Sequence, residues 1–225
     1  MSDPTPYNPL DKVNLGKSVA DALLLRPKVP LGELKQFNGV GIYAIYYNGE
    51  LEAYVQLTQL ARLYQVEIPI YVGKADLEGK RKGLILSSVE SSRSLYKRLA
   101  DHISSINSAT NLDIAEFYCR YLVVDEIWIP LGESLLIARF APLWNQIVDG
   151  FGNHDPGAGR HKGVRSRWDV LHPGRKWNEN LQPRLETPMQ IIDDINEHVR
   201  SSPVIQKLVA GLFPKSDVDL DKGEE

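Results

Sequence analysis

Segments rich in β-branched and aromatic residues constrain the fold of this chain more than any other feature. The first, residues 40–47 (VGIYAIYY), ends at Asn48-Gly49, a strong local signal for a hairpin turn. A return strand is therefore expected over residues 51–56. The second segment, residues 68–72 (IPIYV), has the same composition and predicts another strand. A chain built around such strands needs covering helices to bury the faces of its sheet.

Those helices are predicted by apolar residues at helical spacing. Leu95, Leu99, Ile103 and Ile106 predict an amphipathic helix over residues 92–106. Further helices are expected at residues 17–26, at 57–64, from Pro130 to about Phe140, from Thr187-Pro188 to about Val199, and at 204–213, with a third strand at 117–124. This order predicts an α/β fold, an α+β sandwich in which a small central sheet of about three core strands is flanked by helices.

The composition supports a folded domain and excludes several classes of protein. Of the 225 residues, 43% are hydrophobic and 24% are charged, which provides enough apolar material for a core. No run approaches the roughly 18 apolar residues of a membrane span, and the N-terminus lacks an apolar signal segment, so a cytoplasmic protein is expected. The single cysteine, Cys119, excludes an internal disulfide and a cysteine-built zinc site.

Charge is distributed unevenly, although the net charge is only −3. Residues 151–185 contain seven Lys or Arg against three acidic residues, whereas the last ten residues contain five acids and one lysine. Such asymmetry often accompanies binding to a polyanion, and two solvated stretches of surface explain it equally well. Residues 149–180 are also rich in Gly and Pro, which predicts a long loop of functional or disordered character.

Two triplets mark the strands that are most relevant to function. Residues 41–43 (GIY) lie on the first strand, and residues 71–73 (YVG) end the next. Alone they indicate little more than two tyrosines that face the core, since Tyr is common in strands. They gain weight from polar residues farther along the chain.

Four such polar residues occur in order on the predicted elements. Arg98 and His102 are four residues apart on one helix, so both can face the same site. Glu133 lies in the first turn of the next helix, and Asn145 comes after that helix. Each has an ordinary structural explanation, but their joint order resembles the GIY-YIG nuclease superfamily, with Val in place of the usual Ile in the second triplet.

The resemblance covers residues 39–145 and extends to a subgroup. The stretch 71–75 (YVGKA) and the glycine-rich region after the core are similar to type II restriction endonucleases of this fold, which cut a GC-rich palindrome of the CCGCGG kind. One departure is spacing, because 27 residues separate Tyr43 from Tyr71, more than in the compact superfamily core. We place the excess in a hairpin and helix at residues 48–67.

The resemblance implies roles for the residues that could activate water. Tyr43 would be the general base, although a free phenol has a pKa of about 10 and needs cations to lower it. Lys74, Arg98 and His102 are the local candidates for that task, and His102 could also relay the proton. Tyr71 would hold the water or the phosphate.

The remaining implied roles concern the phosphate and a metal ion. Arg98 can present its planar fork to the scissile phosphate. Glu133 would be the sole carboxylate ligand of one divalent ion per active site, Mg²⁺ or Mn²⁺. Asn145 would orient Glu133 or the phosphate from behind.

Double-stranded DNA is the partner that this resemblance implies. Contacts to it are expected from a set of basic residues after the core: Arg160, Lys162, Arg165, Arg167 and Arg175. Whether these residues meet bases or phosphates stays open. A palindromic target implies a homodimer, with its interface at the N-terminal arm and helix or at residues 187–213, and a cognate DNA methyltransferase as functional counterpart.

The chain is expected to divide into four parts within one compact domain. Residues 1–38 would form an N-terminal arm and helix, 39–148 the nuclease core, 149–185 a basic loop region for DNA contact, and 186–225 the C-terminal helices and acidic tail. Two other functions stay open: a repair, recombination or mobile-element nuclease, and a non-catalytic DNA-binding module. Incubation with plasmid DNA, with and without Mg²⁺, discriminates the three.

Overall fold

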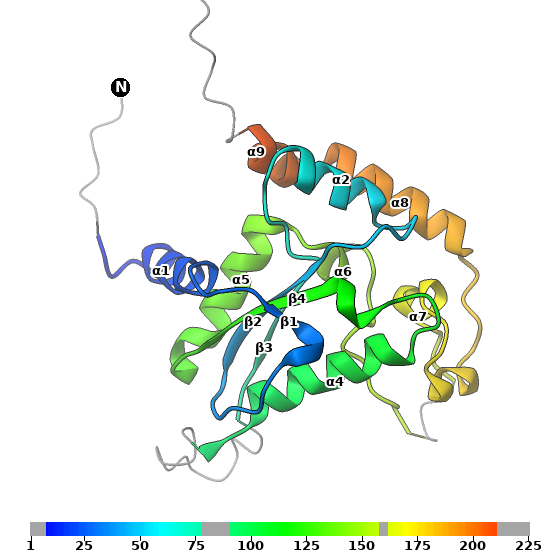
Figure 1. Cartoon of the computed structure of the whole chain (residues 1–225), viewed down its shortest axis with the longest axis horizontal. Coiled ribbons are helices and arrows are strands. Elements are labelled where there is room, and N and C mark those ends of the chain that lie inside the picture. Colours follow the sequence, from blue (N-terminus) through cyan, green and yellow to red (C-terminus); the bar gives the residue numbers. More distant parts are fainter. Residues whose placement is uncertain (1–7, 78–90, 158–161, 211–225) are drawn as a thin grey trace, which may run out of the picture.

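A four-stranded antiparallel sheet forms the centre of the molecule in the computed structural model, which describes residues 8–77, 91–157 and 162–210 (Figure 1). The strands lie in the order β1-β4-β2-β3. Their bounds are Val29–Pro30 for β1, Gly41–Tyr47 for β2, Tyr71–Ala75 for β3 and Phe117–Val123 for β4. The predicted mixture of strands and helices is confirmed, and β1 is one short strand more than the three expected.

Helices cover both faces of this sheet. α1 (Lys12–Leu24) and α5 (Ile129–Phe140) pack on one face, and α4 (Ser94–Ser108) packs on the other (Figure 1). Strand β2 is buried along its whole length because its side chains alternate between two cores. Ile42, Ala44 and Tyr46 face the core shared with α1 and α5, whereas Tyr43 and Ile45 face the core shared with α4.

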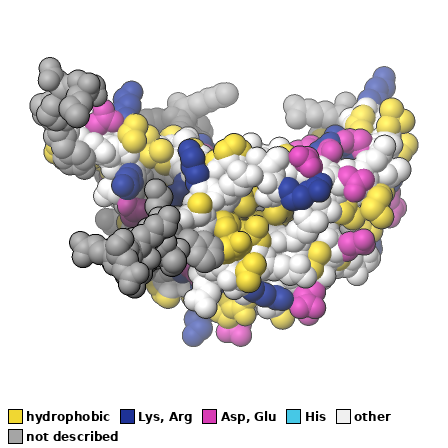
Figure 2. Space-filling view, turned by 90° about the horizontal axis from the view of Figure 1, so that it is seen from above, with side chains coloured by type: hydrophobic (Ala, Val, Ile, Leu, Met, Phe, Trp, Pro, Cys, Tyr) yellow, Lys and Arg dark blue, Asp and Glu magenta, His cyan; other side chains and the backbone are white. Residues whose placement is uncertain are grey.

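Nine further elements complete the described part of the fold. They are η1 (Leu31–Glu33), α2 (Val55–Leu63), η3 (Ile114–Glu116), η4 (Glu126–Trp128), α6 (Leu143–Gln146), α7 (Arg167–Leu171), η6 (Lys176–Asn180), α8 (Pro188–Ser201) and α9 (Pro203–Ala210). As predicted, α8 begins at Thr187, whose side chain forms a capping box with Gln190. Viewed from above, the side that carries α2, α8 and α9 shows charged side chains of both signs among apolar ones (Figure 2).

The expected hairpin after Gly49 is wrong. Both edges of β2 are already occupied, since Tyr43 is paired with Gly73 of β3 and with Tyr121 of β4. A return strand therefore has no edge to join, and residues 51–54 turn into α2 instead. Asn48 donates its backbone N–H to Glu116 O, which leads the chain out of the sheet.

Three other boundaries differ from the expectation. Residues 12–15, expected as an extended arm, belong to α1, because the Asp11 side chain caps that helix by accepting from Val13 N. β3 begins at Tyr71 and reaches Ala75. Residues 149–180 are not one long loop, because α7 and η6 lie within them. The acidic tail lies outside the described residues.

Within residues 8–77, 91–157 and 162–210, no helix has the length and apolar character that crossing a membrane requires.

Candidate active site

The two tyrosines of the triplets lie side by side on the α4 face of the sheet. The register that pairs Tyr43 with Gly73 places Tyr71, two residues before Gly73, on the same face. The ring centroids of Tyr43 and Tyr71 are 6.1 Å apart. A Cβ atom on Gly73 would lie 2.4 Å from the Tyr43 hydroxyl oxygen, so only glycine leaves room for that phenol. Gly73 of the second triplet thus leaves the space that the Tyr43 side chain of the first triplet occupies.

Helix α4 brings Arg98 and His102 to this pair. The Tyr43 hydroxyl lies 2.6 Å from His102 Nε2, and both side chains are buried. Arg98, one turn earlier, donates from Nη1 to Gly152 O at 3.2 Å. The same Nη1 donates to His154 Nε2 at 3.0 Å. Four of the predicted residues, Tyr43, Tyr71, Arg98 and His102, therefore meet at one place.

Burial governs protonation at this site. It raises the pKa of Tyr43 well above its ordinary value, Tyr71 raises it further, and the Arg98 charge acts in the opposite direction. The pKa of Tyr71 is raised by burial in the same way and lowered in part by Arg98. Burial also lowers the pKa of His102 well below its ordinary value, and the Arg98 charge adds to this effect. His102 is therefore a neutral imidazole, which corrects its expected role as a cation beside the phenol.

Glu133 and Lys74 lie on the opposite face of the sheet from Tyr43. Lys74 is paired with Ile42 in the register, and its Nζ is 2.7 Å from Glu133 Oε2. Helix α5 comes close because Gly132 has no side chain, since a Cβ there would lie 2.9 Å from Ile42 Cδ1. The charge that Lys74 carries is thus directed at Glu133, which differs from its expected action on the phenol.

The two faces meet at β3, which is an edge strand. The Glu133 carboxylate acts on Tyr71 from the other side of this strand, where its charge contributes to the raised pKa of that phenol. The site therefore surrounds the edge of β3, with phenols, guanidinium and imidazole on one side and a carboxylate on the other.

The donor set at Glu133 fits a hard divalent ion. Among the described residues, no three or more His, Cys, Asp or Glu side chains gather as metal ligands would. The Glu133 side chain is 19% exposed and already faces one cation, the Lys74 ammonium. A single carboxylate with waters and substrate oxygens suits Mg²⁺ or Mn²⁺, which keep much of their hydration. Zinc in a structural site, which takes four protein ligands, does not fit.

Asn145 is placed differently from the expectation. Its Oδ1 accepts from Val72 N at 2.8 Å, and its Nδ2 donates to Val72 O at 2.8 Å. The side-chain amide therefore pairs with the outer edge of β3 as a neighbouring strand would. These two hydrogen bonds attach Asn145 to the strand that carries Tyr71.

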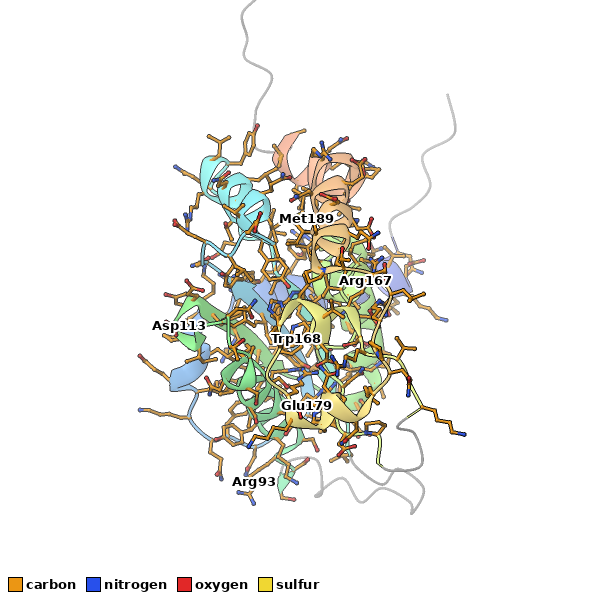
Figure 3. All side chains as sticks on the ribbon, turned by 90° about the vertical axis from the view of Figure 1, so that its right-hand side faces the viewer. Arg93, Asp113, Arg167, Trp168, Glu179 and Met189 are labelled. Atoms are coloured by element: carbon orange, nitrogen blue, oxygen red, sulfur yellow. The ribbon has the colours of Figure 1, made fainter. Side chains whose placement is uncertain are left out.

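The basic residues after the core have different surroundings from one another. Arg167 binds Glu186 and lies 2.7 Å from Asp194, whereas Arg165 is half-buried and donates to Asn178 O. Figure 3 shows Arg167 and Trp168 on α7, between Met189 of α8 and Glu179 of η6. Lys162 is exposed, and Arg160 lies outside the described residues.

The expectation that Arg175 contacts DNA is corrected by its burial. Its side chain is 3% exposed and lies 3.4 Å from the Asp169 carboxylate. Its guanidinium carbon lies 3.9 Å from the Trp168 ring centroid. A guanidinium in this position interacts with groups in the interior of the protein.

The sequence did not point to the segment that closes the site. Phe151 stacks on the His102 ring, Gly152 accepts from Arg98, and His154 contacts Arg98 as well. A Cβ on Gly152 would lie 2.5 Å from Arg98 Nη2 and 3.5 Å from the Tyr71 hydroxyl. The glycine at position 152 is a signal for this segment, but its meaning becomes clear only when Arg98 is known to lie beside it.

A cavity of about 680 Å³ adjoins His154. Serines of α4 line one wall, and residues around η6 line the other: Ser104, Ser105, Ser108, Lys176 and Trp177. The cavity follows α4 from Asp101 to Ser108 and includes His154, which contacts Arg98.

The family model of the Eco29kI GIY-YIG domain matches residues 35–199, which is well over half of the chain. No curated protein matches this chain.

Proposed function

Because the chain belongs to the Eco29kI GIY-YIG domain family, whose members are restriction endonucleases, we propose that it hydrolyses both strands of a short GC-rich palindrome in DNA. Family membership makes the chain a nuclease and a hydrolase. Eco29kI recognises CCGCGG, and a related site is our proposal for this chain. The observation that carries the mechanism is the 2.6 Å contact of Tyr43 with His102 beside Arg98.

The Tyr43–His102 pair can take the proton of an attacking water. Neutral His102 accepts the hydroxyl proton of Tyr43 at Nε2, while the Tyr43 oxygen takes a proton from water. The water oxygen then attacks phosphorus, and the 3′ oxygen leaves. Because the phenol loses one proton and gains another, it does not persist as an anion in a buried place that raises its pKa. The proton from water resides on His102 as a short-lived imidazolium, since burial lowers the pKa of that imidazole. His102 then releases this proton to solvent, and the departing 3′ oxygen takes one from solvent, which balances the hydrolysis.

Arg98 and Tyr71 hold the phosphate in this proposal. The guanidinium fork matches two phosphoryl oxygens, a geometry that lysine does not reproduce. Gly152 O and His154 Nε2 now accept from Arg98 Nη1, and a phosphate would compete with them for this donor. Glu133 would hold one Mg²⁺ or Mn²⁺ ion per active site, which supplies polarisation of the phosphate and stabilisation of the leaving oxygen when bound.

Membership of a restriction endonuclease family implies binding to DNA. We propose that Lys162, Arg165 and Arg160 are the basic residues that contact it, since Arg175 is buried and Arg167 is paired with acids. A palindromic site further supports a homodimer in which each subunit cuts one strand. A cognate DNA methyltransferase would protect the host DNA in the same compartment, the cytoplasm.

Digestion of plasmid DNA tests the function directly. The wild-type protein with Mg²⁺ should give discrete double-strand fragments whose mapped ends share one palindrome. Glu133→Ala and Arg98→Ala should each abolish cleavage while circular dichroism remains that of the wild type. Glu197→Ala, which removes an exposed carboxylate on α8, is the matched control and should cut normally.

Two outcomes would contradict this proposal. Nicking confined to branched or damaged DNA would indicate a repair or mobile-element nuclease. Retarded migration of DNA without cleavage, under every divalent ion tried, would indicate a binding module.

A further inference from the structure

The ring of Phe151 is the closest aromatic neighbour of the His102 imidazole. The two rings are stacked with centroids 4.3 Å apart and planes 12° from parallel. The edge of Phe151 also meets Tyr71, with centroids 5.1 Å apart. One apolar side chain thus contacts two members of the candidate active site, although it comes from outside the strands and helices that carry them.

The backbone of this segment is fixed by a buried cation. Arg175 donates from Nη2 to Phe151 O at 2.5 Å and from Nη1 to Gly150 O at 3.0 Å. Asp169 lies 3.4 Å from the same guanidinium, and Ser166 donates to that carboxylate at 2.6 Å. Two carbonyls and one carboxylate therefore fix Arg175, which in turn fixes the position of Phe151.

Aromatic side chains hold the Phe151 ring from its other sides. Trp144 of α6 lies 4.3 Å away and Trp168 of α7 lies 5.6 Å away between centroids. Phe151 itself is 1% exposed. A ring enclosed in this way has little freedom to move, and neither does the imidazole stacked on it.

We propose that Phe151 is a positioning residue for the nuclease reaction, which fixes the His102 imidazole against the Tyr43 hydroxyl and keeps water away from it. This inference rests on the proposed function. An imidazole that tilts or takes up water loses the 2.6 Å geometry through which it accepts the phenol proton. The Arg175 anchor explains why a buried cation is retained after the nuclease core.

The groups that face His102 make the idea testable by pH. They are Tyr43 of β2, Tyr71 of β3, Arg98 of α4, and Arg175 and His154 of the segments after the core. All of them remain when Phe151 is shortened, so only the enclosure of His102 changes. Entry of water would return its pKa toward the ordinary value of about 6.5.

The test compares Phe151→Leu with Phe117→Leu, the same truncation in the same core. The Phe117 ring contacts Tyr47 and Trp144. We expect Phe151→Leu to lower kcat for plasmid cleavage about ten- to a hundredfold with KM nearly unchanged. Its activity should fall as the pH drops through about 6.5, because His102 then becomes protonated, whereas the wild-type protein should stay active to lower pH. Phe117→Leu should keep the wild-type kcat and pH profile.

Arg175→Lys gives a second variant in case Phe151→Leu does not fold. It keeps the charge near His102 but loses the fork that binds both carbonyls, so the same shift of the acid limb is expected. A wild-type pH profile and kcat in folded Phe151→Leu or Arg175→Lys would overturn the inference. An inactive wild-type protein would instead refute the proposed function, so the two failures are distinguishable.

Discussion

Two tyrosine–histidine pairs lie buried on the same face of the sheet. In each, the phenol oxygen is 2.6 Å from His Nε2: Tyr43 with His102, and Tyr54 with His172. The second pair belongs to a closed chain of hydrogen bonds. Trp144 Nε1 donates to the Tyr54 hydroxyl at 2.8 Å, Tyr54 donates to His172, and His172 Nδ1 donates to Asn111 Oδ1 at 3.1 Å. Every polar atom of that chain serves to join α7 to the core.

The first pair differs in what lies beside it. Arg98 acts on the Tyr43 phenol and lowers its pKa against the effect of burial, whereas the groups that act on Tyr54 are Trp144 and Tyr47. Burial lowers the pKa of His172 to about 3, so this imidazole is also neutral. A short Tyr–His contact alone therefore does not mark a catalytic pair. What distinguishes the first pair is that an arginine acts on its phenol, whereas the groups that act on the Tyr54 phenol are uncharged side chains.

The largest contrast is expected on removing the two hydroxyls. Tyr43→Phe should lower kcat about 10²- to 10⁴-fold, the usual contribution of a general base, and should cost about 1–3 kcal/mol of unfolding free energy because His102 loses a buried partner. Tyr54→Phe should leave kcat within a few-fold but cost about 1–3 kcal/mol of unfolding free energy, because Trp144 Nε1 and His172 lose a buried partner. Cleavage assays and urea unfolding measure the two effects.

Equal losses of activity in Tyr43→Phe and Tyr54→Phe would contradict the assignment of catalysis to one pair. Far-ultraviolet circular dichroism serves as the control that both variants are folded.

Acid should reveal the buried histidine of the second pair. The pKa of His172 is about 3 in the folded chain and about 6.5 when unfolded. Between these values the unfolded chain binds the proton and the folded chain does not. The unfolding free energy should therefore fall by about 1.4 kcal/mol for each unit by which the pH is lowered. His172→Gln should flatten this dependence while the contribution of His102 remains. Parallel pH curves for the two proteins would contradict the prediction.

The smallest effect is expected at the end of the second chain. Asn111→Ala removes the acceptor of His172 Nδ1, and water can take its place because Asn111 is exposed. The loss should be about 1 kcal/mol of unfolding free energy, with kcat within a few-fold of the wild type. A hundredfold loss of cleavage would show instead that the second pair supports the first.

The strands and long helices could be predicted because local sequence determines them. The β-branched and aromatic composition of residues 40–47 and the helical spacing over residues 92–106 are local properties that do not depend on which distant segments lie beside them. The prediction of a hairpin at Asn48-Gly49 was wrong because local sequence does not determine which strands pair. A turn propensity acts over four residues, whereas the pairing of β2 with β3 and β4 is decided by segments far away in the chain.

The same limit applies to the site. The resemblance placed Tyr43, Arg98, His102 and Glu133 on the right elements, but it could not show that β3 separates Glu133 from the phenol. It also suggested that Arg175 faces DNA. Only a contact across the chain, to the carbonyls of Gly150 and Phe151, shows that this arginine is an internal anchor.

The amide of Asn145 has a consequence for the solution behaviour of the protein. Exposed sheet edges invite further strands to add, which leads to aggregation. Here one edge is the two-residue strand β1, which contains Pro30, and the other is β3, where the Asn145 side chain engages the N–H and C=O of Val72. One small side chain thereby discourages strand addition at the border of the sheet that lies beside the candidate active site.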